Sequence, residues 1–128
     1  MEGVYQKGNH KVPEVSFDPE TAIFEIKGSS IPENSGAVYE PIIEFLKEYK
    51  EQAKDTTTLN IALSYFNTSS SKWILNILRL IKEIIVKKNK EVVINWYYEP
   101  EDEEMLEAAN DYQSILNLEI VKIEQKFD

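Results

Sequence analysis

Five consecutive polar residues lie between a strand-like apolar run and a long apolar helix. Residues 67–71 read Asn-Thr-Ser-Ser-Ser. Asn, Ser and Thr are preferred caps for the amino end of a helix, but a cap needs only one of them. The hydroxyls beyond the cap lie where free backbone N–H groups and the helix dipole stabilise added negative charge. The cluster therefore has two interpretations, a plain helix cap or a group of hydroxyls of which one accepts a phosphoryl group.

A second segment concentrates negative charge. Between Lys90 and Lys122 the chain has no Lys or Arg, while seven carboxylates fall between residues 99 and 111. One interpretation is a docking surface for a partner with basic residues. The other is a solvated helix start, because carboxylates in a first turn are favoured by the helix dipole. The seven carboxylates belong to Glu99, Glu101, Asp102, Glu103, Glu104, Glu107 and Asp111.

The sequence lacks the residues that most kinds of catalytic site require. The only histidine is His10, in a predicted amino-terminal loop, so neither a Ser-His-acid triad nor a multi-histidine metal site can form. There is no cysteine, and the four glycines never approach the spacing of a phosphate-binding loop. The carboxylates of residues 101–104 face no group that would make them an acid–base pair. We therefore expect no catalysis, no metal site and no cofactor.

Length and composition predict a single domain over residues 1–128. The chain is 42% hydrophobic and 29% charged, which suits one buried core, and no linker or repeat divides it. A net charge of -9 disfavours nucleic acid as a partner. The start has no apolar signal region, and charged residues interrupt the longest apolar run. We therefore expect a cytoplasmic protein without membrane insertion.

The spacing of apolar residues predicts alternating strands and helices. The helix that contains Pro41 should begin near Tyr39 and end near Lys54, because proline is tolerated in a first turn. In the strand over residues 58–66, Leu59, Ile61, Leu63 and Tyr65 are expected on one apolar face. The predicted strands cover residues 12–17, 21–28, 58–66, 91–98 and 118–124, and the predicted helices cover residues 38–54, the stretch from residues 67–71 to about 90, and 101–116.

This order of elements predicts an α/β two-layer sandwich. Its mixed five-stranded sheet consists of an N-terminal hairpin followed by parallel strands. Two strands have a polar second face, so we place about three helices on one face and leave the other partly open. Residues 67–71 and 97–102 then fall at the carboxyl ends of parallel strands, the edge at which open α/β sheets bind their ligands.

Two stretches carry a resemblance to a known family. "ALSYFNTSSSKWIL", followed by "INWYYEPEDEEMLEAANDYQ", resembles the SiaC family of bacterial regulatory phosphoproteins, which are similar in fold to the STAS anti-sigma-factor antagonists. The opening "VPEVSFDPETAIFEIKGSSIPENS" and the helix "YEPIIEFLKEY" extend the resemblance over nearly the whole chain. It implies a STAS-like fold and a role in signal transduction, including cyclic di-GMP signalling.

The resemblance implies partner switching. A serine/threonine kinase would phosphorylate Thr68, with Asn67, Ser69 and Ser70 shaping its loop, and a PP2C-type phosphatase would remove the phosphate. The unphosphorylated form would bind and activate a target such as a diguanylate cyclase. The expected partner-binding residues are Tyr97, Tyr98, Glu99, Glu101, Asp102, Glu103 and Glu104.

Two alternatives stay open. The first is a constitutive STAS-like adaptor of the anti-sigma-factor antagonist type, in which residues 67–71 are only a cap. The second, less favoured, is a small metabolic enzyme that uses the acidic edge of the sheet.

Overall fold

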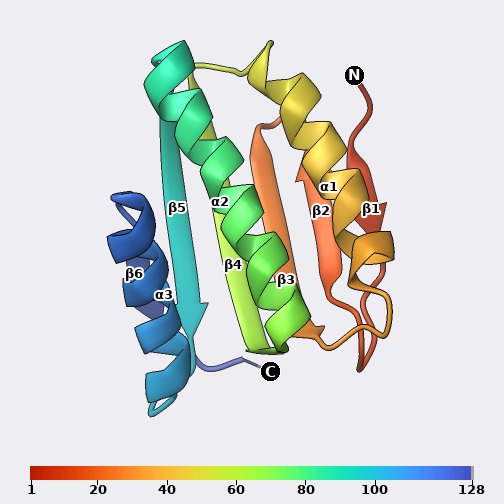
Figure 1. Ribbon diagram of the computed structural model, residues 1–128, viewed down its shortest axis with the longest axis vertical. Coiled ribbons are helices and arrows are strands. Elements are labelled where there is room, and N and C mark those ends of the chain that lie inside the picture. The colour runs from red at the N-terminus through yellow and green to blue at the C-terminus, as the bar shows by residue number, and fades with distance from the viewer. Residues whose placement is uncertain (128) are drawn as a thin grey trace.

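The computed structural model describes residues 1–127, which form one six-stranded sheet and three helices (Figure 1). The strands lie side by side in chain order. β1 to β3 are antiparallel, and β3 to β6 are parallel. The strands are β1 (Val4–Gln6), β2 (Glu14–Asp18), β3 (Ile23–Ser30), β4 (Thr56–Phe66), β5 (Glu91–Tyr98) and β6 (Val121–Glu124); the helices are α1 (Ser35–Lys50), α2 (Thr68–Lys88) and α3 (Glu103–Leu116).

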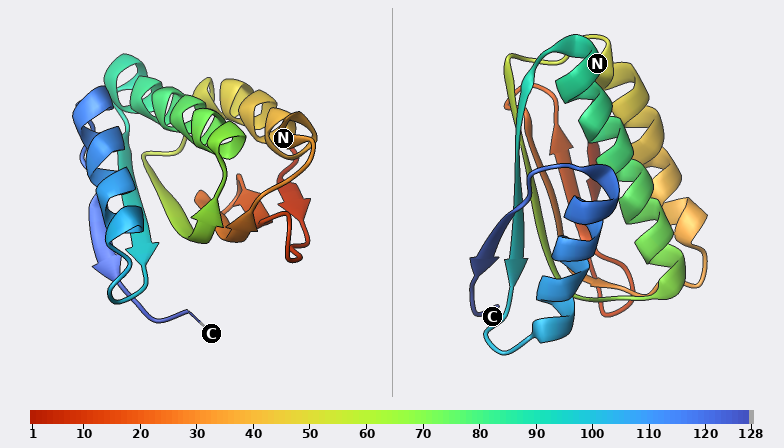
Figure 2. Two further views of the ribbon diagram at one scale, coloured as in Figure 1. Left: turned by 60° about the horizontal axis from the view of Figure 1, so that its bottom comes forward. Right: turned by 60° about the vertical axis from the view of Figure 1, so that its left-hand side comes forward.

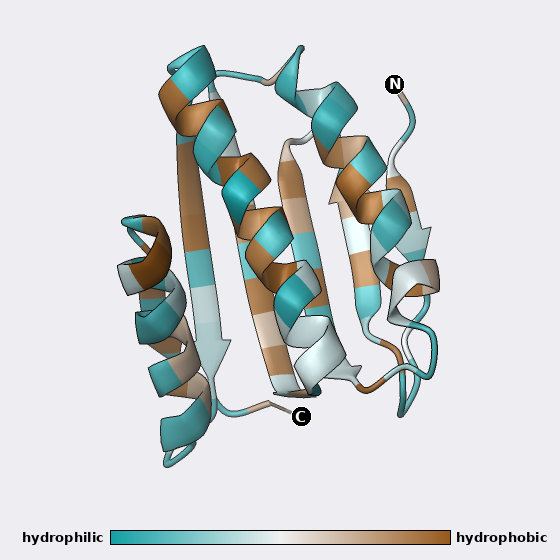
Figure 3. Ribbon diagram, viewed as in Figure 1, coloured by the Kyte–Doolittle hydropathy of each residue, from teal (hydrophilic) through white to brown (hydrophobic). Residues whose placement is uncertain are grey.

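All three helices cover the same face of the sheet, as predicted (Figure 2). α1 and α2 pack side by side, and α3 covers the side of the sheet formed by β5 and β6. Hydrophobic bands recur along α2 and the central strands between polar ones (Figure 3). The core lies between these layers and includes Ile77 and Ile81 of α2, Leu59 and Ile61 of β4, and Trp96 of β5. The two-layer α/β prediction is therefore confirmed.

The sheet has six strands, not the predicted five. The additional strand, β1, is three residues long and pairs Val4 with Phe17 of β2. A strand of this length shows no alternation that the sequence could reveal. The last strand begins at Val121, later than predicted, because the backbone N–H groups of Leu118 and Ile120 donate to the carbonyl and side-chain oxygens of Gln113 in α3 rather than to β5.

Helix α1 begins four residues before Tyr39, so the predicted start was wrong. Asn34 caps the helix, and its side-chain oxygen accepts a hydrogen bond from the Ala37 amide at 3.3 Å. Pro41 therefore lies in the second turn, where it deprives the Ala37 carbonyl of a helical donor. Both residues are exposed, so water can serve that carbonyl. The helix ends at Lys50 rather than near Lys54.

A β-bulge changes the phase of β4 near its end. Gly28 of β3 pairs with Leu63, but the next residue, Ser29, pairs with Tyr65, which leaves Ser64 as the extra residue. Tyr65 is consequently 57% exposed instead of sharing the buried face of Leu63, as was predicted. Phe66 takes the inner position, and its ring meets the ring of Trp96 edge-on, with 6.2 Å between centroids.

Within residues 1–127, none of the helices has the length and apolar character that crossing a bilayer would require.

Candidate functional site

The carboxyl ends of β4 and β5 meet at one edge of the sheet, where α2 and α3 both begin (Figure 1). This arrangement brings residues 67–71 and 97–102 to the same edge, as predicted. Ser64, at the end of β4, lines a small hollow of about 350 Å³ together with Glu99 and residues 100–102. The end of β4, which leads into residues 67–71, is therefore a neighbour of the acidic loop.

Asn67 is the cap of α2. Its side-chain oxygen accepts hydrogen bonds from the Ser70 amide at 2.9 Å and from the Ser69 hydroxyl at 3.0 Å. Its own backbone N–H donates to the carbonyl of Ser30, at the end of β3, at 2.9 Å. The capping role thus falls on the amide residue of the cluster, so none of the four hydroxyls is needed as the cap.

Ser70 is a structural residue. Its side chain is fully buried, and its hydroxyl donates to the Ser30 carbonyl at 3.1 Å and lies 2.8 Å from the Ser30 hydroxyl. The Ser30 hydroxyl in turn lies 2.6 Å from the hydroxyl of Tyr39 on α1. Burial raises the pKa of the Tyr39 hydroxyl, against the smaller opposing effect of its hydrogen bonds to the two serines. These three hydroxyls tie the start of α2 to β3 and α1.

Ser71 also has its hydrogen bonds satisfied within the protein. Its hydroxyl donates to the Thr68 carbonyl at 2.7 Å. Its carbonyl accepts a hydrogen bond from the hydroxyl of Tyr112 on α3 at 2.8 Å. Burial also raises the pKa of the Tyr112 hydroxyl, so it stays protonated and able to donate. Helix α3 is thereby connected directly to the first turn of α2.

Thr68 is the first residue of α2, and it is exposed. Among residues 1–127, its hydroxyl makes no hydrogen bond, and the backbone N–H groups of Thr68 and Ser69 have no acceptor. An exposed hydroxyl therefore lies beside two free amide donors at a helix amino end. This combination favours a group that carries negative charge.

The acidic residues of this edge form no ion pair among residues 1–127. No salt bridge in the described part of the chain involves a carboxylate between residues 99 and 111. Asp102 caps α3, because its carboxylate accepts a hydrogen bond from the Met105 amide at 3.1 Å. Glu103 and Glu104 follow in the exposed first turn. Glu101 has a φ of +70°, a left-handed backbone conformation that is uncommon for glutamate.

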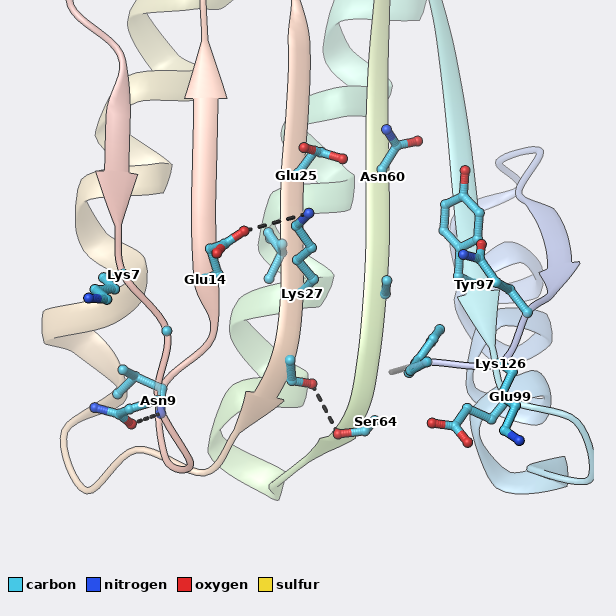
Figure 4. A pocket seen from close by; sticks show the side chains of 17 residues that line it. Lys7, Asn9, Glu14, Glu25, Lys27, Asn60, Ser64, Tyr97, Glu99 and Lys126 are labelled. Atoms are coloured by element: carbon cyan, nitrogen blue, oxygen red, sulfur yellow. Dashed lines mark hydrogen bonds and ion pairs between the residues drawn. The ribbon is translucent and has the colours of Figure 1, made fainter.

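The two tyrosines expected in the docking surface lie on opposite faces of the sheet. Tyr97 lines a hollow of about 970 Å³ on the face without helices (Figure 4). Charged and polar side chains dominate this hollow, and Lys27 and Glu14 form an ion pair there at 3.6 Å. Tyr98 instead packs against the core. The structure therefore does not bring Tyr97 and Tyr98 together.

Sequence reasoning missed two features of this edge. The exposure of Tyr65 follows from the bulge, and the burial of Ser70 follows from its contacts with Ser30 and Tyr39. The sequence did offer one signal of the bulge. Gly28 is the last residue of the predicted strand; in the structure it lies inside β3 with a φ of +105°, and a glycine in a strand often marks a bulge.

In the part of the chain that the structure describes, no three His, Asp or Glu side chains gather as a possible metal site.

Comparison with known proteins places these features in a family context. The model of SiaC family regulatory phosphoproteins matches residues 6–125. An uncharacterised protein of Pseudomonas aeruginosa (strain UCBPP-PA14) is 26% identical over 113 residues, which cover 88% of this chain and 89% of that protein.

Solved structures share the fold. SiaC of Pseudomonas aeruginosa superposes with a TM-score of 0.86 at 22% identity, covering 98% of this chain and 100% of that one. A chain from the crystal structure of the diguanylate cyclase SiaD in complex with its activator SiaC, from the same organism, gives a TM-score of 0.88 at 23% identity, covering 95% and 99%.

Proposed function

Because this chain belongs to the SiaC family of regulatory phosphoproteins, we propose that it switches protein partners according to the phosphorylation of Thr68. A serine/threonine kinase adds the phosphate and a PP2C-type phosphatase removes it. The unphosphorylated form binds and activates a diguanylate cyclase, the class of enzyme that the related SiaC activates in Pseudomonas aeruginosa. The regulator performs no catalysis itself and acts in the cytoplasm.

One observation supports this proposal above all, namely the different environments of the four hydroxyls. Ser70 is buried, Ser71 is bonded to the Thr68 carbonyl, and Ser69 is bonded to the capping oxygen of Asn67. Thr68 alone is exposed with a hydroxyl that makes no hydrogen bond among residues 1–127. A kinase can therefore reach this hydroxyl without breaking a bond of the fold.

The same edge offers a physical basis for switching. A phosphate on Thr68 would add about 1.5 to 2 negative charges and could accept hydrogen bonds from the free amides of Thr68 and Ser69. The domain would keep its fold, while the charge of the edge would change. If the target buries Thr68, the added charge meets a desolvation penalty of several kcal/mol. Phosphorylation would then release the target.

The acceptor is tested by labelling with the cognate kinase. Thr68→Ala should abolish phosphate incorporation, while the matched variant Ser69→Ala should be labelled like the wild type. Labelling that persists on Thr68→Ala and maps to a serine of residues 69–71 would show that the acceptor is wrong.

The switch itself is tested by calorimetric titration of the cognate cyclase. The unmodified protein and Thr68→Ala should bind, and phosphorylation should weaken binding about a hundredfold or more, which corresponds to about 2.8 kcal/mol. Thr68→Asp should copy part of this loss, because a carboxylate carries less charge than a phosphate. If all forms bind alike, the protein is a constitutive adaptor and residues 67–71 are only a helix cap.

A further inference from the structure

The bulge in β4 exposes an aromatic side chain beside the phosphoacceptor. Tyr65 is 57% exposed and precedes Thr68 by three residues. Two contacts hold the bulge in place. The Ser64 hydroxyl donates to the Gly28 carbonyl at 3.2 Å, and it lies 3.0 Å from the Ser29 hydroxyl. The exposure of Tyr65 is therefore a built feature of the sheet edge and not the result of a loose chain end.

Regular pairing would have given a different arrangement. Without the extra residue, Tyr65 would continue the buried alternation of Leu59, Ile61 and Leu63. The bulge gives that inner position to Phe66 and sends Tyr65, with its partner Ser29, to the other face. Leaving a large aromatic side chain in water forgoes the stabilisation of burial. Bulges beside functional sites commonly re-aim a side chain in this way.

The surroundings of Tyr65 combine apolar and acidic surface. Ile31, which is 37% exposed, follows Ser30 at the end of the neighbouring strand. On the other side of β4, Ser64 shares its small hollow with the loop of residues 99–102, whose carboxylates have no salt-bridge partner among residues 1–127. The carboxyl ends of β3 and β4 thus carry exposed apolar side chains with an acidic loop beyond β4. An apolar centre with a polar rim is the usual anatomy of a protein interface.

We propose that Tyr65 is the aromatic anchor of the target-binding surface. Its occupant is an amphipathic segment of the target that sets a large apolar side chain against Tyr65 and Ile31 and directs Lys or Arg towards residues 99–104. The carboxylates of the rim attract the basic side chains of the segment, and the exposed ring of Tyr65 packs against its apolar side chains. This inference rests on the proposed function and names the chemistry of its target.

The arrangement also explains why a phosphate would be poorly tolerated. Thr68 follows Tyr65 by three residues and lies outside the acidic segment of residues 99–104. A phosphate there would be desolvated against apolar groups of the target, while the target's cations lie further away, opposite residues 99–104. A basic target can thus be attracted by the rim and still be released by phosphorylation.

The test compares dissociation of the cognate cyclase from matched tyrosine variants. Tyr65→Ala should raise Kd about tenfold or more, mainly through faster dissociation and with unchanged salt dependence. Tyr65→Phe, which keeps the ring, should stay within about threefold of the wild type. Tyr5→Ala is the control, because Tyr5 is 63% exposed on the distant edge strand β1. Thermal melts of all three variants check the fold.

A footprint of the wild-type complex gives a second measurement that needs no variant. Hydroxyl-radical labelling of Tyr65 should fall when the cyclase binds, and labelling of Tyr5 should not. If Tyr65→Ala binds like the wild type and Tyr65 stays labelled, while phosphorylation of Thr68 still releases the cyclase, the anchor is wrong and the switch stands. If the wild type does not bind the cyclase, the proposed function falls and the anchor with it.

Discussion

The cap and the proposed phosphate acceptor are neighbouring residues at the start of α2. Asn67 supplies the cap, and Thr68 makes no side-chain hydrogen bond among residues 1–127. Asn67→Ala should therefore lower the free energy of unfolding by about 0.5 to 2 kcal/mol. Thr68→Ala should change it by less than about 0.5 kcal/mol. Urea unfolding measures both, and an equal loss in the two variants would mean that the threonine has a structural role.

Glu101 adopts an unfavourable conformation in the acidic loop. Of the four non-glycine residues with positive φ in the described chain, Asn89 and Asn117 are helix C-caps, where asparagine is common. Glutamate has no such preference, and left-handed φ costs it about 1 kcal/mol. A side chain kept in a strained conformation suggests a role outside stability.

The substitution Glu101→Gly separates the effect of this glutamate on stability from its effect on target binding. It should leave the free energy of unfolding unchanged or raise it by up to about 1 kcal/mol, and it should slow association with the target. Glu103→Gly, the same change in a helical turn, should instead lower stability by up to about 1 kcal/mol. Thermal melts and stopped-flow binding measure the two effects. A destabilised Glu101→Gly would show that the glutamate supports the fold.

Helices α1 and α2 are joined by an ion pair that makes stability depend on pH. The Lys50 ammonium lies 2.9 Å from the Glu83 carboxylate, and Lys87 lies 3.4 Å from the same carboxylate. The hydrogen bond from Lys50 is the main cause of a lowered pKa for Glu83, with Lys87 adding to it. A carboxyl group whose pKa is lower in the folded state stabilises the fold above its unfolded value.

This stabilisation should disappear in acid. The wild type should be more stable than Glu83→Gln at neutral pH, and the difference should shrink as pH falls below 4.5, the reference value, and through the lower folded pKa. Glu44→Gln provides the control, because the Glu44–Lys47 pair is far more exposed, and exposed pairs contribute little. Urea unfolding between pH 7 and about 2 measures both differences. A constant gap between wild type and Glu83→Gln would contradict the assignment.

The spacing of apolar residues predicted the helices and strands in which that spacing repeats over many residues. It failed where the local backbone geometry departs from the regular repeat. The buried stripe of α2 and the alternation of Leu59, Ile61 and Leu63 were predictable because each side chain simply follows the period of its element. Strand β1 was too short to show a pattern. The outward turn of Tyr65 depends on pairing with β3, which lies far away in sequence.

The candidate site was also predictable from the sequence only in part. Its place at the sheet edge followed from the order of the elements, and the residue types indicated a cap. Which hydroxyl is buried could not be read from five similar polar residues. Ser70 is enclosed by Ser30 and Tyr39, which precede it by 40 and 31 residues.

Positive and negative charges are distributed unevenly between the two ends of the helices. The ends of α1 and α2 opposite the site carry many lysines, and these have carboxylate partners nearby, such as Glu51 for Lys88 and Asp55 for Lys90. At the site edge, the carboxylates between residues 99 and 111 have no salt bridge within residues 1–127. The unpaired carboxylates therefore leave excess negative charge around the start of α3. A basic target would be steered to this end of the molecule.

Reversing two of these charges tests the steering. Glu103→Lys combined with Glu104→Lys should slow association with the cognate target at low salt, with little change in dissociation, because rim charges mainly set the association rate. The effect should fade as salt rises, since charges are screened beyond about 10 Å at 0.1 M. The control, Glu44→Lys with Glu48→Lys on exposed positions of α1, makes the same change in net charge away from the edge. Stopped-flow kinetics at several salt concentrations measure the association rates of both double variants. Equal slowing by both would mean that net charge alone steers the target. No slowing by the variant at residues 103 and 104 would mean that the acidic edge is not part of the docking surface.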